Sequence, residues 1–214
     1  MKTRLARSLP PPAVTALYRC LLDDTMTLAQ SLGSVEVAVM CPASDVDDLA
    51  WLARDSVRIV AQAGEGLAAG LTSVFAHFAA SGHQRIIAFN SDSPHLPASA
   101  LEYAFEALAT HDLIVGPTHD GGYYLVGAKV AHAGLFNGDG MGKSNALDLL
   151  LARAQSLRLS VGLADPFYDI DVASDLMRLA TELRLVPSRA PRTAAWLAEW
   201  GQLVAQLPLG TGDL

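Results

Sequence analysis

The sequence predicts an α/β protein in which a mostly parallel central sheet lies between two layers of helices. Helix-like and strand-like segments alternate from residue 13 onward, and each pair of parallel strands needs a crossover connection, usually a helix. The segment "RIIAFN" is apolar on both faces, which is typical of a strand covered on both sides. With 214 residues the chain is long enough to bury about 70% of its unfolded surface, so one domain is expected.

The first half of the chain alternates helices with strands. Leucines recur at near-helical spacing from residue 17 to residue 32, and Gly33 provides a left-handed end for this helix. Ser44 or Asp45 is expected to cap the next helix. The expected elements are a helix over 13–33, a strand over 35–40, a helix over 44–53, a strand over 57–62, a helix over 66–82 and a strand over 85–90.

The second half repeats this alternation, except that two strands follow each other directly. The Asp-Gly pair between them is the strongest short signal for a hairpin turn. The expected elements are a helix over 98–109, strands over 112–117 and 123–129, a helix over 145–157, a strand over 159–163, and helices over 173–183 and 191–206.

The composition excludes several classes of protein. Apolar residues make up 51% of the chain and charged residues 17%, which excludes a disordered chain. The longest apolar runs fall well short of the ~20 residues of a membrane span. A formal charge of -7 argues against a nucleic-acid polymer as partner, because such binding depends on clusters of Lys and Arg. A mononucleotide needs only a few local cations.

The N-terminus and the cysteines indicate a cytoplasmic protein. The segment "MKTRLARSLPPP" lacks the apolar stretch of a signal peptide. Cys20 and Cys41 have no C-x-x-C spacing for zinc. The sequence leaves a disulfide between them open, but reduced thiols are expected.

Residues 142–144, Gly-Lys-Ser, look like the end of a phosphate-binding P-loop. That pattern places its first Gly five positions earlier, where this chain has Asn137, and Gly138 is one residue too close. We therefore interpret the segment as a turn into the next helix, with Ser144 or Asn145 as its N-cap. The alternative, a P-loop NTPase, predicts that Lys143→Ala abolishes ATP affinity.

Carboxylates follow two of the predicted strands. Asp92 comes just after "RIIAFN", and Asp169 and Asp171 follow "LSVGL". Because ligands of such sheets gather at the carboxyl ends of strands, these residues can converge. Two carboxylates about 4 Å apart repel by roughly 4 kcal/mol, so a bridging Mg²⁺ would stabilise them. The alternative is structural: Asp92 begins a turn and Asp171 caps a helix.

Two glycine-rich loops are candidate ligand sites. The segment "GPTHDGGYYLVG" places adjacent glycines after Asp120, where backbone can approach a ligand closely; it also fits a plain hairpin, with Tyr123 or Tyr124 lining a pocket. The segment "AQAGEGLAAGL" ends a strand in a loop whose backbone could recognise a base. His119 is a candidate base, although a surface position is expected for all six histidines.

Four segments together resemble a known family: "MKTRLA", "FNSDSPHLP", "VGPTHDGGYYLVGAK" and "YDIDVASDL". The chain is similar to bacterial GT-A-like transferases of the nucleotide-diphospho-sugar transferase superfamily, whose members are named as glycosyltransferases or nucleotidyltransferases. It is more distantly similar to phospholactate guanylyltransferases. The similarity covers about residues 2–183, and the ordered set of motifs is more specific than any one of them.

The resemblance implies a role for each motif. A divalent ion, Mg²⁺ or Mn²⁺, is expected to bind Asp92 and Asp171. The residues expected to bind the nucleotide are Lys2, Arg4, Gln62, Gly64, Gly66 and Asp92. Those expected to bind the acceptor are Asp120, Gly121, Gly122 and Tyr123, and the expected catalytic set is Asp92, Asp120 and Asp171.

The chain departs from the family pattern at both ends. Family members have a buried strand and a loop before the Lys-Thr-Arg motif, and that strand would lie beside segments 35–40 and 85–90. Either the true start lies upstream of Met1, or another segment fills the gap, or activity is lost; the hypothesis is a truncated or misassigned start, with the first strand of the family lacking here. Residues 184–214 form a C-terminal helical extension of a single domain over 1–214, and its apolar stripe is expected to pack on that domain, with a homodimer as the alternative.

The expected function is transfer of a glycosyl group from a nucleoside diphosphate sugar to a small-molecule acceptor, with Mg²⁺. The Lys-x-Arg start favours an alternative, nucleotidyl transfer from a nucleoside triphosphate. A further alternative is a non-catalytic nucleotide-binding remnant that keeps the fold.

Overall fold

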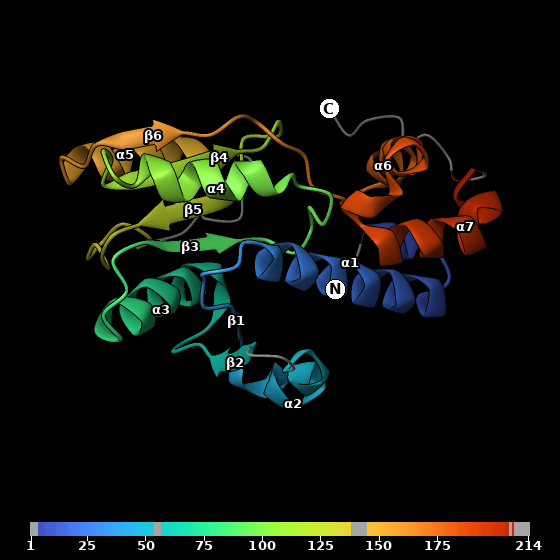
Figure 1. Ribbon diagram of the computed structural model, residues 1–214, viewed down its shortest axis with the longest axis horizontal. Helices are drawn as coiled ribbons and strands as arrows, with labels where there is room; N and C mark the ends of the chain where they lie inside the picture. Colours follow the sequence, from blue (N-terminus) through green and yellow to red (C-terminus); the bar gives the residue numbers. More distant parts are fainter. Residues whose placement is uncertain (1–3, 54–56, 138–144, 206, 208–214) are drawn as a thin grey trace. The chain divides into compact units, whose positions relative to one another are not determined.

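The computed structural model describes residues 4–53, 57–137, 145–205 and 207, and they gather into two compact units (Figure 1). The sheet unit comprises Leu32–Asn90 and Ala98–Phe167 and contains every strand of the described chain. The helical unit comprises the described residues of Met1–Ser31, Ser91–Pro97 and Tyr168–Leu214. The division into one domain with an extension over 184–214 stays a prediction.

The sheet unit follows the predicted order of elements closely. Its strands are β1 (Ala38–Cys41), β2 (Arg58–Ala61), β3 (Ile86–Phe89), β4 (Leu113–Pro117), β5 (Tyr123–Ala128) and β6 (Val161–Leu163). Its α-helices are α2 (Val46–Leu49), α3 (Gly66–Ala80), α4 (Ala98–Ala107) and α5 (Ala146–Ser156).

The predicted helix over 44–53 is broken in the structure. Two 3-10 turns, Ala43–Asp45 and Ala50–Leu52, flank the single α-helical turn of α2. Asp45, one of the two expected caps, is the N-cap residue of α2, but its side chain makes no capping hydrogen bond and instead accepts one from the Ser44 hydroxyl at 2.7 Å. The apolar stripe of this segment is too short to stabilise a longer helix.

The sheet unit contains a parallel pair, β1–β2, and a four-stranded sheet in the order β3-β5-β4-β6 (Figure 1). In the larger sheet β3, β4 and β6 run in one direction and β5 runs in the other. The direction of β5 follows from its connection, since residues 118–122 are too few for a crossover and form a hairpin. The predicted mostly parallel α/β arrangement is therefore confirmed, with β5 as the reversed strand.

No described strand pairs with both β1 and β3. Of the described strands, β1 pairs only with β2, and β3 pairs only with β5. The resemblance places an additional strand at this position, between segments 35–40 and 85–90. The proposed origin of that strand stays a prediction.

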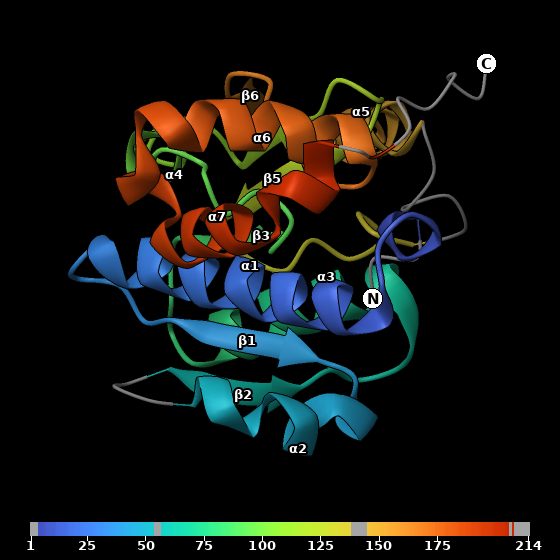
Figure 2. The same ribbon diagram turned by 90° about the vertical axis from the view of Figure 1, so that its right-hand side faces the viewer.

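Helices cover both faces of the four-stranded sheet. On one face, side chains of β4 and β5 pack with α3 and α5 in a cluster that includes Phe75, Val115 and Leu150. On the other face, α4 packs against β3 and β4. Gly127 sits in a tight row there, because a Cβ atom at this position would lie 2.5 Å from the Ile114 side chain. The predicted three-layer order is confirmed. Apart from this sheet, α2 lies against the paired strands β1 and β2 (Figure 2).

The helical unit contains the longest helix and the C-terminal helices. Its elements are the 3-10 turns Leu5–Arg7 and Pro187–Arg189 and the helices α1 (Pro11–Ser31), α6 (Ala173–Leu185) and α7 (Pro191–Ala205). The stripe of α7 is buried through Trp196, Leu197 and Val204 in one cluster with α1 and α6. The extension therefore packs within its own unit, as expected, and a homodimer stays a prediction.

Buried carboxylates join α1 to α7. Asp24, which is 2% exposed, accepts hydrogen bonds from the backbone N–H groups of Arg192 (3.1 Å) and Thr193 (2.8 Å) and so caps α7. Beside it, the Asp23 carboxylate lies 2.6 Å from the Arg192 guanidinium. This pair of contacts ties the first and last described helices together.

Among the described helices, none is both long and apolar enough to cross a membrane. Both cysteine thiols are free, as expected. A cytoplasmic location stays a prediction.

Candidate functional site

Asp92 and Asp171 are brought close together in the helical unit by main-chain pairing. The Asp92 carbonyl accepts a hydrogen bond from the Ile170 N–H at 2.9 Å, and the Ser93 hydroxyl donates to the Tyr168 carbonyl at 3.0 Å. Both carboxylate side chains are half-buried. The predicted convergence of the two sequence segments is therefore present in the backbone.

The start of α6 is capped by a different carboxylate from the one expected in the structural alternative. The Asp175 carboxylate accepts the N–H groups of Asp171 (3.0 Å) and Val172 (2.9 Å). Asp175 thus forms the reach-back half of a capping box at the N-terminus of α6, whose N-cap residue is Val172. The alternative that Asp171 serves as the cap of this helix is wrong.

The donor set at Asp92 and Asp171 fits a hard divalent ion. In the described part of the chain, no group of three or more His, Cys, Asp or Glu side chains is arranged to hold a metal. An ion at the carboxylate pair would therefore take its other ligands from substrate phosphates and water. Mg²⁺ binds in this way, through one or two carboxylates plus phosphate oxygens.

An aromatic cluster supports the loop that carries Asp92. His95 is fully buried, and its ring lies 4.5 Å from the Tyr168 ring. Burial lowers the pKa of His95 to about 4, so the imidazole is neutral at physiological pH. The guanidinium of Arg178 covers the Tyr168 ring at 3.7 Å. The expectation that all six histidines lie on the surface is wrong for His95, which the two flanking prolines and the paired segment enclose.

The hairpin between β4 and β5 is closed by a network around Asp120. The Thr118 N–H donates to the Gly122 carbonyl at 3.0 Å, which confirms the predicted turn. The Thr118 hydroxyl donates to Oδ1 of Asp120 at 2.5 Å, and the Gly122 N–H donates to the same oxygen at 3.2 Å. Gly121 has a φ of 87°, where a side chain would be strained. The loop is anchored further where the Leu147 N–H donates to the Gly121 carbonyl at 3.0 Å.

The two tyrosines after this loop are directed into the fold. Tyr124 is 2% exposed and its hydroxyl donates to the Asp165 carbonyl at 3.2 Å. Tyr123 packs against the α3–α5 face of the sheet, and its hydroxyl is buried without a hydrogen-bond partner among the described residues. Burial raises the pKa of Tyr123 to about 12. Its expected contact with an acceptor stays a prediction.

The loop after β2 is braced by its own glutamine. The Gln62 carboxamide donates to the Gly64 carbonyl at 2.9 Å, and both Gly64 and Gly66 have a φ of 80°. A Cβ atom at Gly70 would lie 2.8 Å from the Gln62 side-chain oxygen. These contacts give the loop one defined shape, while its role in nucleotide binding stays a prediction.

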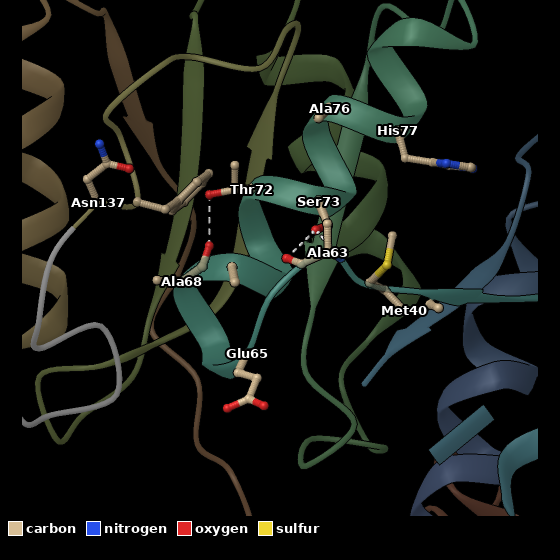
Figure 3. Close-up of a pocket in the computed structure, with 12 residues that line it drawn as sticks. Met40, Ala63, Glu65, Ala68, Thr72, Ser73, Ala76, His77 and Asn137 are labelled. Carbon is tan, nitrogen blue, oxygen red and sulfur yellow. Dashed lines mark hydrogen bonds between the residues drawn. The ribbon is translucent and has the colours of Figure 1, made fainter. Parts of the chain in front are cut away.

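A hollow of about 620 Å³ opens beside this loop in the sheet unit (Figure 3). Its volume is typical of small-molecule sites. It is lined by Met40, Ala61, Ala63, Glu65, Ala68, Ala69, Thr72, Ser73, Ala76, His77, Phe136 and Asn137. The hydroxyls of Thr72 and Ser73 are engaged by the Ala68 and Ala63 backbone, whereas Nε2 of His77 is buried without a partner in the described chain.

Sequence reasoning missed this hollow. The available signal was the run of small side chains on one face of α3, which leaves space that larger residues would fill.

Several residues that the sequence singled out lie at or beyond the limits of the described residues. Arg4 is exposed at the start of the first 3-10 turn, and Lys2 lies outside the described residues. Lys143 and Ser144 lie outside them as well. Asn145 is the N-cap residue of α5, as expected, although its side chain makes no capping hydrogen bond.

Comparison with solved structures supports the same fold. A "putative nucleotide-diphospho-sugar transferase" from Desulfovibrio desulfuricans G20 matches with a TM-score of 0.86 and 25% sequence identity, over 96% of this chain and 91% of that one. Rv0371c from Mycobacterium tuberculosis H37Rv matches with a TM-score of 0.51 and 20% identity, over 74% of this chain and 82% of that one. Its homolog from mycobacterium sp. strain JC1 matches with a TM-score of 0.50 and 22% identity, over 77% and 84%.

Sequence comparison identifies the family. No curated protein matches the chain. Residues 25–143, more than half of the sequence, match the bacterial family described as "Uncharacterized protein conserved in bacteria (DUF2064)". The matched region includes the Asp92 loop, the Gln62 loop and the Asp120 hairpin. The chain therefore belongs to this bacterial family and has the fold of the nucleotide-diphospho-sugar transferases.

Proposed function

We propose that the chain is a divalent-metal-dependent glycosyltransferase that uses a nucleoside diphosphate sugar as donor and a small molecule as acceptor. The observation that carries the proposal is the pairing of the Asp92 loop with the segment before Asp171, while Asp175 caps α6. Asp92 and Asp171 lie at backbone segments that are joined by a hydrogen bond, and carboxylate oxygens are ligands that a hard divalent ion takes. The likeness to a structure named as a nucleotide-diphospho-sugar transferase supports the class of donor.

The proposed reaction requires no nucleophile from the protein. The bond between the sugar's anomeric carbon and the phosphate oxygen breaks with its electron pair on that oxygen, and the acceptor oxygen forms the new bond and loses its proton. A bound Mg²⁺ or Mn²⁺ supplies positive charge to the diphosphate that leaves. Asp92 and Asp171 would hold this ion, and Arg4 with Lys2 would contact the phosphates.

In this proposal, loops of the sheet unit contact the nucleoside and the acceptor. The braced loop with Gln62, Gly64 and Gly66 offers backbone groups to the nucleoside, next to the hollow that Glu65 lines. The hairpin presents an exposed Asp120 carboxylate whose Oδ1 is held in place by two donors. An anchored carboxylate of this kind suits contact with an acceptor hydroxyl.

Ligand-induced stabilisation tests the proposal and separates it from its alternatives. The melting temperature would be measured with uridine and guanosine diphosphate sugars and with the four nucleoside triphosphates, each with and without Mg²⁺. Stabilisation by a diphosphate sugar only with Mg²⁺ supports glycosyl transfer. Stabilisation by a triphosphate alone among these ligands would favour nucleotidyl transfer, the alternative suggested by the Lys-x-Arg start.

A non-catalytic remnant would behave differently from both enzymes. It should bind nucleotide without metal, and Asp92→Asn should leave that binding unchanged. In the proposed transferase, Asp92→Asn removes the Mg²⁺-dependent part of the stabilisation.

A further inference from the structure

We propose that Thr118 is a positioning residue, whose hydroxyl fixes the Asp120 carboxylate so that its second oxygen, Oδ2, is presented to the acceptor. This inference rests on the proposed transferase function. Thr118 has no expected role among the residues named from the sequence or from the resemblance.

The two hydrogen bonds to Asp120 reach the same oxygen. The Thr118 hydroxyl and the Gly122 N–H both donate to Oδ1, at 2.5 and 3.2 Å. No described residue donates to Oδ2, and the side chain is exposed. The carboxylate is thus held on one side and open on the other. In the proposed reaction the proton of the acceptor hydroxyl passes to Oδ2 as the acceptor oxygen bonds to the anomeric carbon.

Thr118 is itself held by hydrogen bonds of the sheet unit. It is 8% exposed, and its N–H is bonded to the Gly122 carbonyl. It also lies in a parallel bridge with Phe167, whose N–H donates to the Pro117 carbonyl at 3.0 Å. The Thr118 hydroxyl is therefore fixed by pairing at the edge of the sheet, and it restrains the exposed Asp120 carboxylate.

The space around this hydrogen bond is closed. A Cβ atom at Gly122 would lie 2.8 Å from the Thr118 hydroxyl oxygen and 3.3 Å from Oδ1 of Asp120. The glycine therefore admits both donors to one oxygen. A short bond between a hydroxyl and a carboxylate is among the strong hydrogen bonds in proteins. Without it an exposed Asp side chain moves among its staggered rotamers.

Loss of this orientation should lower the rate of the chemical step. A reacting group displaced by about 1 Å can cost on the order of 10²-fold in rate. Thr118→Val keeps the size and branching of the side chain and removes only the donor. Thr118→Ser keeps the donor and serves as the matched control.

The test uses the release of nucleoside diphosphate from uridine or guanosine diphosphate glucose, with water in the place of the acceptor. Thr118→Val should lower kcat by about 10- to 100-fold with the donor KM unchanged, and Thr118→Ser should keep kcat within about 3-fold of the wild type. In an Asp120→Asn background Thr118→Val should add no further loss, because both changes remove the same function. A crystal structure of Thr118→Val should show the Asp120 carboxylate rotated away from Gly122.

The outcomes separate this inference from the proposed function. If the wild type releases nucleotide and Asp120→Asn does not, but Thr118→Val equals Thr118→Ser, the positioning role is wrong and the function stands. An unmoved Asp120 in the Thr118→Val crystal structure would overturn the inference in the same way. If the wild type releases no nucleotide from either donor, the proposed function fails and the inference falls with it.

Discussion

Removal of the Asp24 carboxylate, which joins α1 to α7, should lower the free energy of unfolding more than a change at the neighbouring Asp23. Asp24 is 2% exposed and accepts two backbone N–H groups at the start of α7, at 3.1 and 2.8 Å. Asp24→Ala leaves both donors without a partner, one of them buried. Each lost bond of this type costs about 1–3 kcal/mol, so we expect a loss of about 3 kcal/mol in the free energy of unfolding.

For a chain of this length a loss of that size corresponds to a fall of roughly 6–12 °C in Tm. The assay is urea unfolding followed by tryptophan fluorescence, because Trp196 and Trp200 lie on α7 and report on its release. Asp23→Asn is the matched control. The Asp23 side chain is 11% exposed and its partner, the Arg192 side chain, is 55% exposed, so we expect a cost of about 1–2 kcal/mol, smaller than that of Asp24→Ala. A loss below about 1 kcal/mol for Asp24→Ala, or equal losses for both variants, would refute the capping argument.

Three further predictions concern pH, packing and the Gly-Lys-Ser segment. Burial lowers the pKa of His95 in the folded chain to about 4, from its ordinary value of 6.5, so the unfolded chain binds the proton first as pH falls. The free energy of unfolding should therefore fall by about 3 kcal/mol as pH drops from 6.5 to 4. A plot of Tm against pH should be flatter for His95→Gln than for the wild type. Gly116→Ala places a Cβ atom 2.5 Å from the Tyr124 ring and should lower the free energy of unfolding by about 1–3 kcal/mol. Gly201→Ala in α7, where a Cβ atom meets no neighbour within 4 Å, should raise it by roughly 0.5–1 kcal/mol. Unfolding curves that rank the two variants in the opposite order would contradict the packing account. Lys143→Ala should leave ATP affinity unchanged, and a loss in calorimetric titration would restore the P-loop alternative.

Periodicity in the sequence located most elements because each one buries a single regular face. The leucines of α1 and the apolar run of β3 each pack in the way that their spacing predicts. The single helix predicted over 44–53 was wrong. The Ser44 hydroxyl there donates to the Asp45 carboxylate, a contact that local helix propensity does not reveal. The separation into a sheet unit and a helical unit was not predicted, since it depends on long-range pairing of residues 91–97 with residues 168–170.

The candidate site was predictable to the extent that it follows strand ends. Asp92 and Asp171 could be paired from the rule that strand ends collect ligands, and the Asp-Gly signal located the Asp120 hairpin. The role of Asp175 as cap of α6 was hidden, because several acids in that segment could serve equally well. The hollow beside α3 was also hidden, because it is defined by absent side-chain volume and by residues as distant in sequence as Met40 and Asn137.

Metal binding at the carboxylate pair is the claim on which the account depends. Mn²⁺ binding would be measured by electron paramagnetic resonance in the presence of uridine and guanosine diphosphates, for the wild type, Asp171→Asn and Asp175→Asn. Asp171→Asn should abolish nucleotide-dependent Mn²⁺ binding, while Asp175→Asn, which leaves both proposed ligands in place and keeps a side-chain oxygen for the N–H groups of Asp171 and Val172, should retain it. Equal Mn²⁺ affinity in the wild type and Asp171→Asn would contradict the account.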